Sequence, residues 1–152
     1  MNQVQEAQKI LEEKYNVSCD VWSVTSYNEL RREALHAQRA NLLNGKHVQT
    51  SYLTQLLKNE TGVFVAASDY MKALPDSIRQ WMPSPFTVLG TDGFGRSETR
   101  EALRDFFEVD AKHIVWATLV SLAHEKKISS NVLEAAQKDL KINANKLNPM
   151  IS

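Results

Sequence analysis

Two short, unbroken apolar runs constrain the fold more than any other feature of this chain. The first, Val63-Phe64-Val65-Ala66-Ala67, follows Gly62, and the second, Phe86-Thr87-Val88-Leu89, follows a proline-containing stop at residues 82–85. A short apolar run bounded by turn-forming residues is typical of a parallel strand that is buried on both faces. Stretches with helical spacing lie before, between and after the two runs. The sequence therefore predicts an α/β fold of three layers, with a mostly parallel sheet covered by helices on both faces.

The first third of the chain is predicted to contain two helices and one more strand. The apolar residues of 4–15 recur at helical spacing, and Asn16 is suited to a left-handed helix end. Residues 19–24 are rich in β-favouring side chains and are predicted to form a strand. A helix is expected over residues 27–43, ending at Asn44-Gly45. Its N-cap is expected at Thr25 or Ser26.

The rest of the chain is predicted to be mainly helical outside the two apolar runs. A short helix is expected around residues 52–57, although the surrounding stretch 44–61 is the hardest part of the chain to assign. The other predicted helices, with their expected caps, are 69–81 after Asp69 and broken near Pro75, 98–107 after Ser97, one through 114–123 after Asp110, and 131–140 after Ser129 or Ser130.

Length and composition indicate one ordinary globular domain over residues 1–152. Acidic and basic side chains number 18 each and apolar residues make up 43%, so nothing suggests a nucleic-acid or anionic-membrane partner. No stretch approaches the ~20 apolar residues of a membrane helix. The single cysteine, Cys19, has no partner for an internal disulfide and is expected to be a small buried side chain in its strand. This cysteine usage suits a reducing cytoplasm, where we expect the protein to reside.

One glycine-rich segment, Gly90-Thr91-Asp92-Gly93-Phe94-Gly95-Arg96-Ser97, stands out from the rest. Its order is G-x-x-G-x-G, whereas the dinucleotide fingerprint is G-x-G-x-x-G, and no P-loop lysine follows. It does lie between a predicted strand and a predicted helix, where α/β proteins often bind anions. Two interpretations remain open: a tight loop that packs closely, also against another domain, or an anion site. The candidate residues for either role are Asp92, Gly93, Gly95, Arg96, Ser97 and Arg100.

No pattern in the sequence predicts a catalytic, cofactor-binding or metal-binding residue. The four histidines, His36, His47, His113 and His124, are scattered, and none has a metal-ligand spacing. There is no G-x-S-x-G elbow for a serine nucleophile. From the residues alone, the chain is an α/β domain with one distinctive loop.

That loop carries a resemblance to a known family. The stretch from Val88 to Ser97, continued by Arg100, Leu103-Arg104 and Phe106 to Asp110, resembles the C-terminal domain of homodimeric, bacterial-type pyruvate dehydrogenase decarboxylating components. The same family is matched, in order, by Asp20 to Tyr27 with Glu29-Leu30, by Ala67 to Lys72 and by Asn148-Pro149. A looser likeness to transketolase C-terminal domains goes with it. The resemblance spans nearly the whole chain, although residues 44–61 match poorly.

The resemblance implies a parent enzyme with three α/β domains that uses thiamine diphosphate and Mg²⁺. Such an enzyme decarboxylates pyruvate and passes the acetyl unit to lipoyl groups on the acyltransferase core of its complex. Cofactor and metal lie between the first two domains, at the dimer interface, and the third domain supplies none of their ligands. The matched domain is therefore expected to complete the subunit, to contribute to dimer contacts and to be inactive alone. The alternative is a free-standing module that binds a small anion or regulator and has no enzymatic activity.

The chain departs from the family pattern at its N-terminal side. The family domain opens with a strand and a glycine-containing turn ahead of the helix that begins here near Val4, and neither is present. We therefore expect the sheet to lack its first strand. An open strand edge favours self-association, because its unpaired N–H and C=O groups can pair with another chain.

Overall fold

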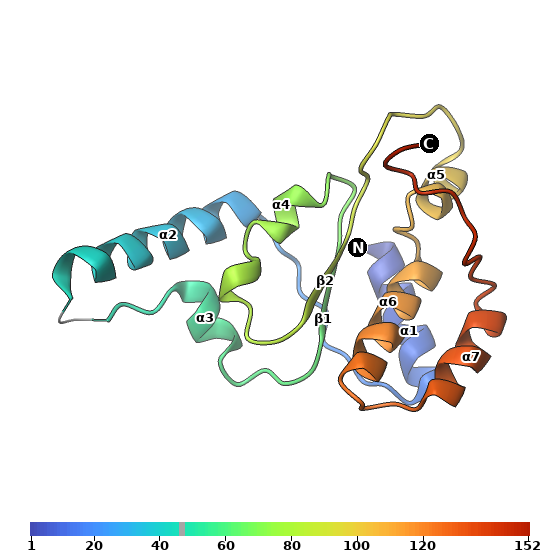
Figure 1. Cartoon of the computed structure of the whole chain (residues 1–152), viewed down its shortest axis with the longest axis horizontal. Helices are drawn as coiled ribbons and strands as arrows, with labels where there is room; N and C mark the ends of the chain where they lie inside the picture. Colours follow the sequence, from blue (N-terminus) through green and yellow to red (C-terminus); the bar gives the residue numbers. More distant parts are fainter. Residues whose placement is uncertain (46–47) are drawn as a thin grey trace.

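The computed structural model describes residues 1–45 and 48–152 (Figure 1). Three helices precede the first strand, a short helix and a 3₁₀ turn separate the two strands, and helices fill the last third of the chain. The elements are α1 (Asn2–Tyr15), α2 (Tyr27–Asn44), α3 (Tyr52–Leu57), β1 (Phe64–Ala67), α4 (Ala73–Asp76), a 3₁₀ turn (Arg79–Trp81), β2 (Phe86–Leu89), α5 (Arg100–Phe106), α6 (Ala111–His124) and α7 (Ser130–Asp139). The predicted α/β class is confirmed.

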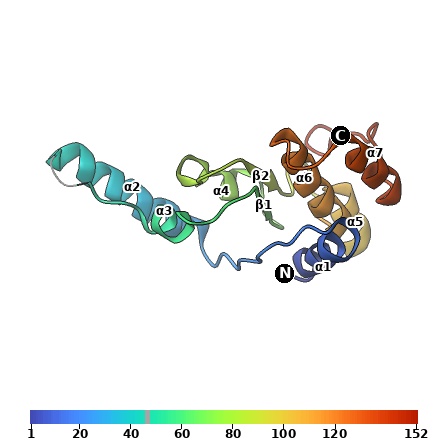
Figure 2. The same cartoon turned by 90° about the horizontal axis from the view of Figure 1, so that it is seen from below.

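The two predicted apolar runs form the sheet of the described chain. Strands β1 and β2 pair in parallel, with Phe64 opposite Phe86 and Ala67 opposite Leu89. Because side chains alternate along a strand, each strand contributes to two cores. Val65, Ala67 and Leu89 pack toward α1, α6 and α7, whereas Phe64, Ala66 and Val88 pack toward α3 and the 3₁₀ turn. The two views show these helix groups on opposite sides of the strands, as predicted (Figures 1 and 2).

The larger core lies between the sheet and three helices. Helix α6 is at its centre: Val115 and Leu119 are 0% exposed, and α6 packs against α1, α7 and both strands. A helix in this position is expected to be apolar on nearly every side, as the sequence of α6 is. Even so, no described helix is long and apolar enough to cross a lipid bilayer.

The smaller core lies on the other face of the sheet. Its buried members are Leu53, Leu57, Ile78 and Phe86, which come from α3, the end of the α4 region and β2. Helix α2 lies at the margin of this core and projects away from the sheet (Figure 1). Of its 18 residues only Ala34 and Ala37 are buried, so most of its length is open to solvent.

Several helix ends are confirmed as predicted. Asn16 ends α1 in the left-handed conformation with φ of 53°, and Gly45 ends α2 with φ of 58°. At the N-termini, the side chain of Ser26 accepts a hydrogen bond from the Glu29 amide, and that of Asp110 accepts one from the His113 amide.

The predicted strand over residues 19–24 is wrong. This segment forms no ladder, and among the described residues the sheet consists of β1 and β2 alone. Burial alternates from Val17 to Val21 as in a strand, but the Cys19 carbonyl accepts its hydrogen bond from the Gln8 side chain. A segment with strand propensity forms a strand only where a neighbouring strand supplies hydrogen-bond partners. Cys19 is accordingly only half-buried.

Two predicted helix starts are also wrong: tertiary hydrogen bonds determine the conformation around Asp69, and a different local residue caps α5. The expected helix 69–81 begins only at Ala73, after Lys72 instead of Asp69, and it gives way to a 3₁₀ turn at Arg79. Residues 68–72 are instead bonded to the loop after β2. Helix α5 begins at Arg100 and is capped by Thr99, whose side chain accepts from the Ala102 amide, and not by Ser97.

The larger core should dominate stability. Leu119→Ala removes a fully buried side chain, so we expect it to lower the free energy of unfolding by about 2–5 kcal/mol. Leu42→Ala, at a position that is 81% exposed on α2, serves as the control and should change it by less than about 0.5 kcal/mol. Urea denaturation followed by circular dichroism measures both. Equal costs for the two variants would contradict this account of the core.

Candidate functional site

The glycine-rich loop, residues 90–97, begins where β2 ends and is tied to the segment that follows β1. The Ser68 amide donates to the Leu89 carbonyl at 3.1 Å, and the Thr91 amide donates to the Tyr70 carbonyl at 2.9 Å. The Lys72 amide donates to the Asp92 carboxylate at 2.9 Å, and the Thr91 hydroxyl donates to the Asp69 carbonyl at 2.8 Å. The start of the loop and residues 68–72 therefore form one hydrogen-bonded unit.

Two of the three loop glycines are required by close backbone contacts. A Cβ at Gly90 would lie 2.6 Å from the Tyr70 carbonyl oxygen. A Cβ at Gly93 would lie 2.2 Å from the carbonyl oxygen of Pro149 in the C-terminal tail, and Gly93 has a φ of 110° that side chains disfavour. Around Gly95 a Cβ would meet nothing within 4 Å. These contacts support the interpretation of the segment as a tightly packed loop.

The charged loop residues have separate partners. Asp92 accepts from the Lys72 amide, whereas the Arg96 guanidinium lies over the Phe106 ring, 4.2 Å from its centre. No ion pair joins Asp92 to Arg96 in the described part of the chain. Ser97 and Arg100 are exposed, and Thr99 takes the capping role expected of Ser97. The six candidate residues thus line one loop but do not converge on a common point.

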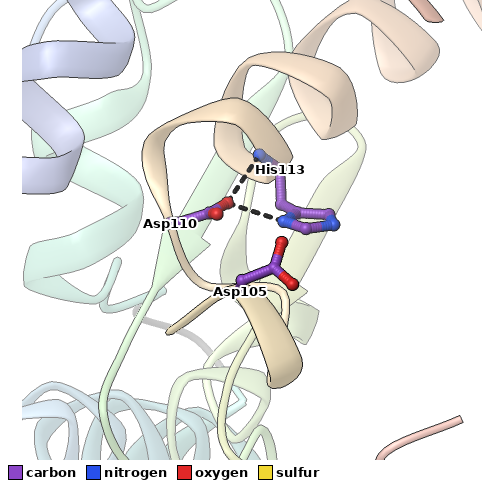
Figure 3. A group of neighbouring side chains, drawn as sticks. All are labelled: Asp105, Asp110 and His113. Carbon is purple, nitrogen blue, oxygen red and sulfur yellow. Dashed lines mark hydrogen bonds and ion pairs between the residues drawn. The ribbon is translucent and has the colours of Figure 1, made fainter. Parts of the chain in front are cut away.

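The structure also brings together Asp105, Asp110 and His113, a group that the sequence analysis did not identify (Figure 3). Their potential ligand atoms lie within 4.8 Å of one another, across the junction between α5 and α6. Asp110 Oδ1 lies 2.6 Å from His113 Nδ1 and accepts from the His113 amide at 3.1 Å. The sequence signal was the Asp110-x-x-His113 spacing, which we had interpreted only as a helix cap.

Two lysines occupy the surroundings of this group. Lys112 forms an ion pair with Asp105, and Lys146 of the C-terminal tail donates to the Asp105 carbonyl and lies 3.8 Å from its carboxylate. The hydrogen bond from Lys112 holds the pKa of Asp105 below its usual value; Lys146 and His113 also lower it, against a rise from burial. The cluster is therefore an ion-pair joint that links α5, α6 and the tail.

Cys19 is not placed as a nucleophile. Burial raises the pKa of its thiol, and the nearby carboxylates of Glu12 and Asp20 raise it further. A thiol in such surroundings stays protonated at neutral pH and is unreactive.

Helices α1 and α7 are also joined at the surface. The side chains of Lys14 and Tyr15 both donate a hydrogen bond to the Asp139 carboxylate, each at 3.1 Å.

The chain matches a family model over most of its length. Residues 1–110 match the model described as the transketolase-like TK C-terminal domain. The chain belongs to this family.

Within the transketolase-like C-terminal domain family, the similar curated proteins are pyruvate dehydrogenase E1 components. The chain is 43% identical to the one from Pseudomonas aeruginosa over 152 residues and 44% identical to the one from Buchnera aphidicola over 155. It is 40% identical to the one from Escherichia coli K12 over 154 residues. These alignments cover 99–100% of the chain but only 17% of each relative. The resemblance to bacterial pyruvate dehydrogenases is confirmed.

Among the described residues, the group that could hold a metal ion does not suit the Mg²⁺ that the family resemblance implies, together with thiamine diphosphate, for the parent enzyme. Mg²⁺ prefers oxygen ligands in octahedral geometry, whereas the carboxylates of Asp105 and Asp110 already face lysine, histidine and backbone donors. Two open hollows, of about 330 and 460 Å³, lie along α2 and do not include the glycine-rich loop. His47 lies outside the described residues. We therefore assign no step of the chemistry to this domain.

The loop glycines provide a test of the packing interpretation. Gly93→Ala places a methyl group against Pro149 at an unfavourable φ, so we expect it to destabilise the domain by about 1–3 kcal/mol. The matched control is Gly95→Ala in the same loop, where there is space for the methyl group and the cost should stay near or below 0.5 kcal/mol. Chemical denaturation measures both. A Gly95→Ala cost equal to that of Gly93→Ala would rule out the proposed contact with the tail.

The ion-pair joint predicts a specific pH dependence. The folded-state pKa of Asp105 is lowered, so its stabilisation is present above the unfolded pKa of about 3.9 and is lost as the pH falls through the folded value. Asp105→Asn should therefore lower stability at pH 6, by no more than about 1 kcal/mol since the side chain is half-exposed, and this difference should vanish near pH 2.

The control for this titration is Glu98→Gln, an exposed carboxylate with no ion pair among the described residues. The free energy of unfolding of Glu98→Gln should lie within about 0.5 kcal/mol of that of the parent chain at each pH measured. Unfolding in urea at each pH gives both comparisons. The assigned pairing with Lys112 would be contradicted if the difference in unfolding free energy between Asp105→Asn and the parent chain did not change with pH.

Proposed function

We propose that this chain is the C-terminal domain of a pyruvate dehydrogenase E1-type enzyme, in which it has a structural and dimer-contact role. The observation that carries the proposal is the similarity of the whole chain, at 40–44% identity, to a segment of proteins with that name. The residue-level evidence agrees, because the distinctive loop uses its glycines and charges for packing inside the domain. Catalytic residues would then lie in other parts of the enzyme.

The proposal includes the parent reaction and its partners. The parent enzyme would decarboxylate pyruvate with thiamine diphosphate and Mg²⁺ bound in its other domains and transfer the acetyl group to lipoyl groups of an acyltransferase core. The direct partners of this domain would be the remaining domains of the subunit and the second subunit of a homodimer. We place this enzyme in the cytoplasm, in keeping with the single free cysteine.

We also propose that residues 1–152 form one domain whose sheet is completed by a further strand. In the family pattern this strand precedes the helix that corresponds to α1. Two observations support the proposal: β1 pairs with β2 alone among the described residues, and residues 17–21 show strand-like alternation of burial without a ladder. A two-stranded sheet is weak by itself, so an added strand would stabilise the domain.

The proposed lack of activity is tested by turnover. The purified chain, supplied with pyruvate, thiamine diphosphate and Mg²⁺, should release no carbon dioxide above a protein-free blank. The E1 component of Escherichia coli K12, assayed in parallel, is the positive control. Decarboxylation by this chain alone, in proportion to its concentration, would refute the assignment of a non-catalytic role.

The alternative function, anion binding by the glycine-rich loop, predicts a ligand-dependent melting temperature. Binding to the folded state stabilises it by mass action. Because Arg96 stacks on Phe106 and Thr99 caps α5, we expect millimolar phosphate to leave the melting temperature unchanged in both the parent chain and Arg96→Ala. A rise with phosphate that Arg96→Ala abolishes would favour the anion-binding module instead.

A further inference from the structure

Several exposed apolar side chains lie on three segments near the carboxyl ends of the strands. The segments are residues 70–72 after β1, residues 90–96 after β2, and residues 149–151 of the C-terminal tail. Five of the fifteen large apolar side chains exposed in the described chain belong to them. We call these five the carboxyl-end patch: Tyr70, Met71, Phe94, Met150 and Ile151.

The backbone contacts already described hold the three segments together. Gly90 and Thr91 contact Tyr70 and Lys72, and Gly93 contacts Pro149 and Met150. Figure 1 shows the loop after β2 and the C-terminus close together at this end of the molecule. Phe94, flanked by Gly93 and Gly95, is 80% exposed although the backbone on one side of it is fixed. The loop therefore presents an aromatic side chain to solvent from a constrained position.

Such an arrangement costs free energy in an isolated domain. Large apolar side chains gain nothing from exposure, whereas covering them releases about 25 cal/mol for each Å² removed from water. Exposed apolar patches on folded domains commonly mark surfaces that contact another protein surface. A preformed patch also loses little conformational freedom when it is covered, which favours tight docking.

We infer that the carboxyl-end patch is the surface by which this domain docks onto the rest of a pyruvate dehydrogenase E1-type subunit. This inference rests on the proposed function and names the surface that would carry it. The occupant is a protein surface with an apolar centre that receives Phe94, because interfaces inside a permanent assembly have such centres. The relatives supply a source for it, since the matched segment is only 17% of their length and the remainder offers the neighbouring surface.

The charges around the patch agree with a protein partner of this kind. Lys72, Glu98 and Arg100 are exposed at its margin and carry both signs. A single-sign rim would have indicated a polyanion or a charged membrane surface, whereas a mixed rim is suited to the polar border of a protein interface.

The experiment uses a full-length chimera in which this chain replaces the matching segment of the Pseudomonas aeruginosa E1 component. Amide hydrogen exchange is measured in the chimera and in the isolated chain. Residues 70–72 and 91–96 should exchange at least about tenfold more slowly in the chimera, because a covered surface opens less often. The exposed side of α2 should exchange equally in both.

Matched variants locate the contact. Phe94→Ser and Leu42→Ser replace side chains that are 80% and 81% exposed in the isolated chain, so neither should shift its melting temperature. In the chimera, Phe94→Ser should lower the melting temperature and abolish the extra protection, while Leu42→Ser should do neither. The unmodified Pseudomonas aeruginosa enzyme is the reference for assembly and turnover.

Three outcomes would overturn the inference, in different ways. An assembled and active chimera without extra protection of the patch would refute the docking surface and leave the proposed function standing. A chimera that neither assembles nor turns over pyruvate would refute the proposed function and the inference with it. An isolated chain that dimerises, and that Phe94→Ser but not Leu42→Ser converts to a monomer, would show that the occupant is a second copy.

Discussion

The parallel pairing of β1 with β2 is the contact on which the rest of the described structure depends. Each strand has only four residues, and their side chains alternate between the two faces. Val65, Ala67 and Leu89 join the core of α1, α6 and α7, while Phe64, Ala66 and Val88 join the core of α3 and the 3₁₀ turn. A shift of one residue in either strand would reverse its faces and disrupt both cores together. The pairing also fixes the position of the glycine-rich loop, because Leu89 leads directly into Gly90.

How much of the fold could be predicted depended on whether the signal was local. The apolar runs at 63–67 and 86–89 and the ends of α1 and α2 were predicted correctly, because burial patterns and capping residues lie within a few positions of each other. Residues 19–24 have equally favourable strand propensity, yet they form no strand because a ladder requires a second strand. Asp69 and Ser97 were plausible caps, but hydrogen bonds to residues twenty positions away determine the conformation around Asp69.

The same limit explains what was and was not seen at the candidate site. The sequence identified the glycine-rich loop, but not that Gly90 and Gly93 are needed and Gly95 is not. That distinction depends on Tyr70 and on Pro149, which is more than fifty residues from Gly93. The cluster of Asp105, Asp110 and His113 was missed for a similar reason, since two of its members look like an ordinary helix cap. Its character as an ion-pair joint depends on Lys146, which the tail brings back to α5.

The unequal packing of the two faces bears on why the domain would need a larger assembly. The core around α6 has eight buried apolar residues, whereas the core on the other face has four, and α2 buries only two alanines. Helices in proteins are stabilised mostly by tertiary packing, so α2 gains little from the domain itself. The exposed apolar side chains at the carboxyl ends of the strands add to this imbalance. Of these features, the exposed apolar side chains at the carboxyl ends of the strands are the ones that packing against neighbouring domains would cover, and the proposed place in an E1-type subunit would supply those neighbours.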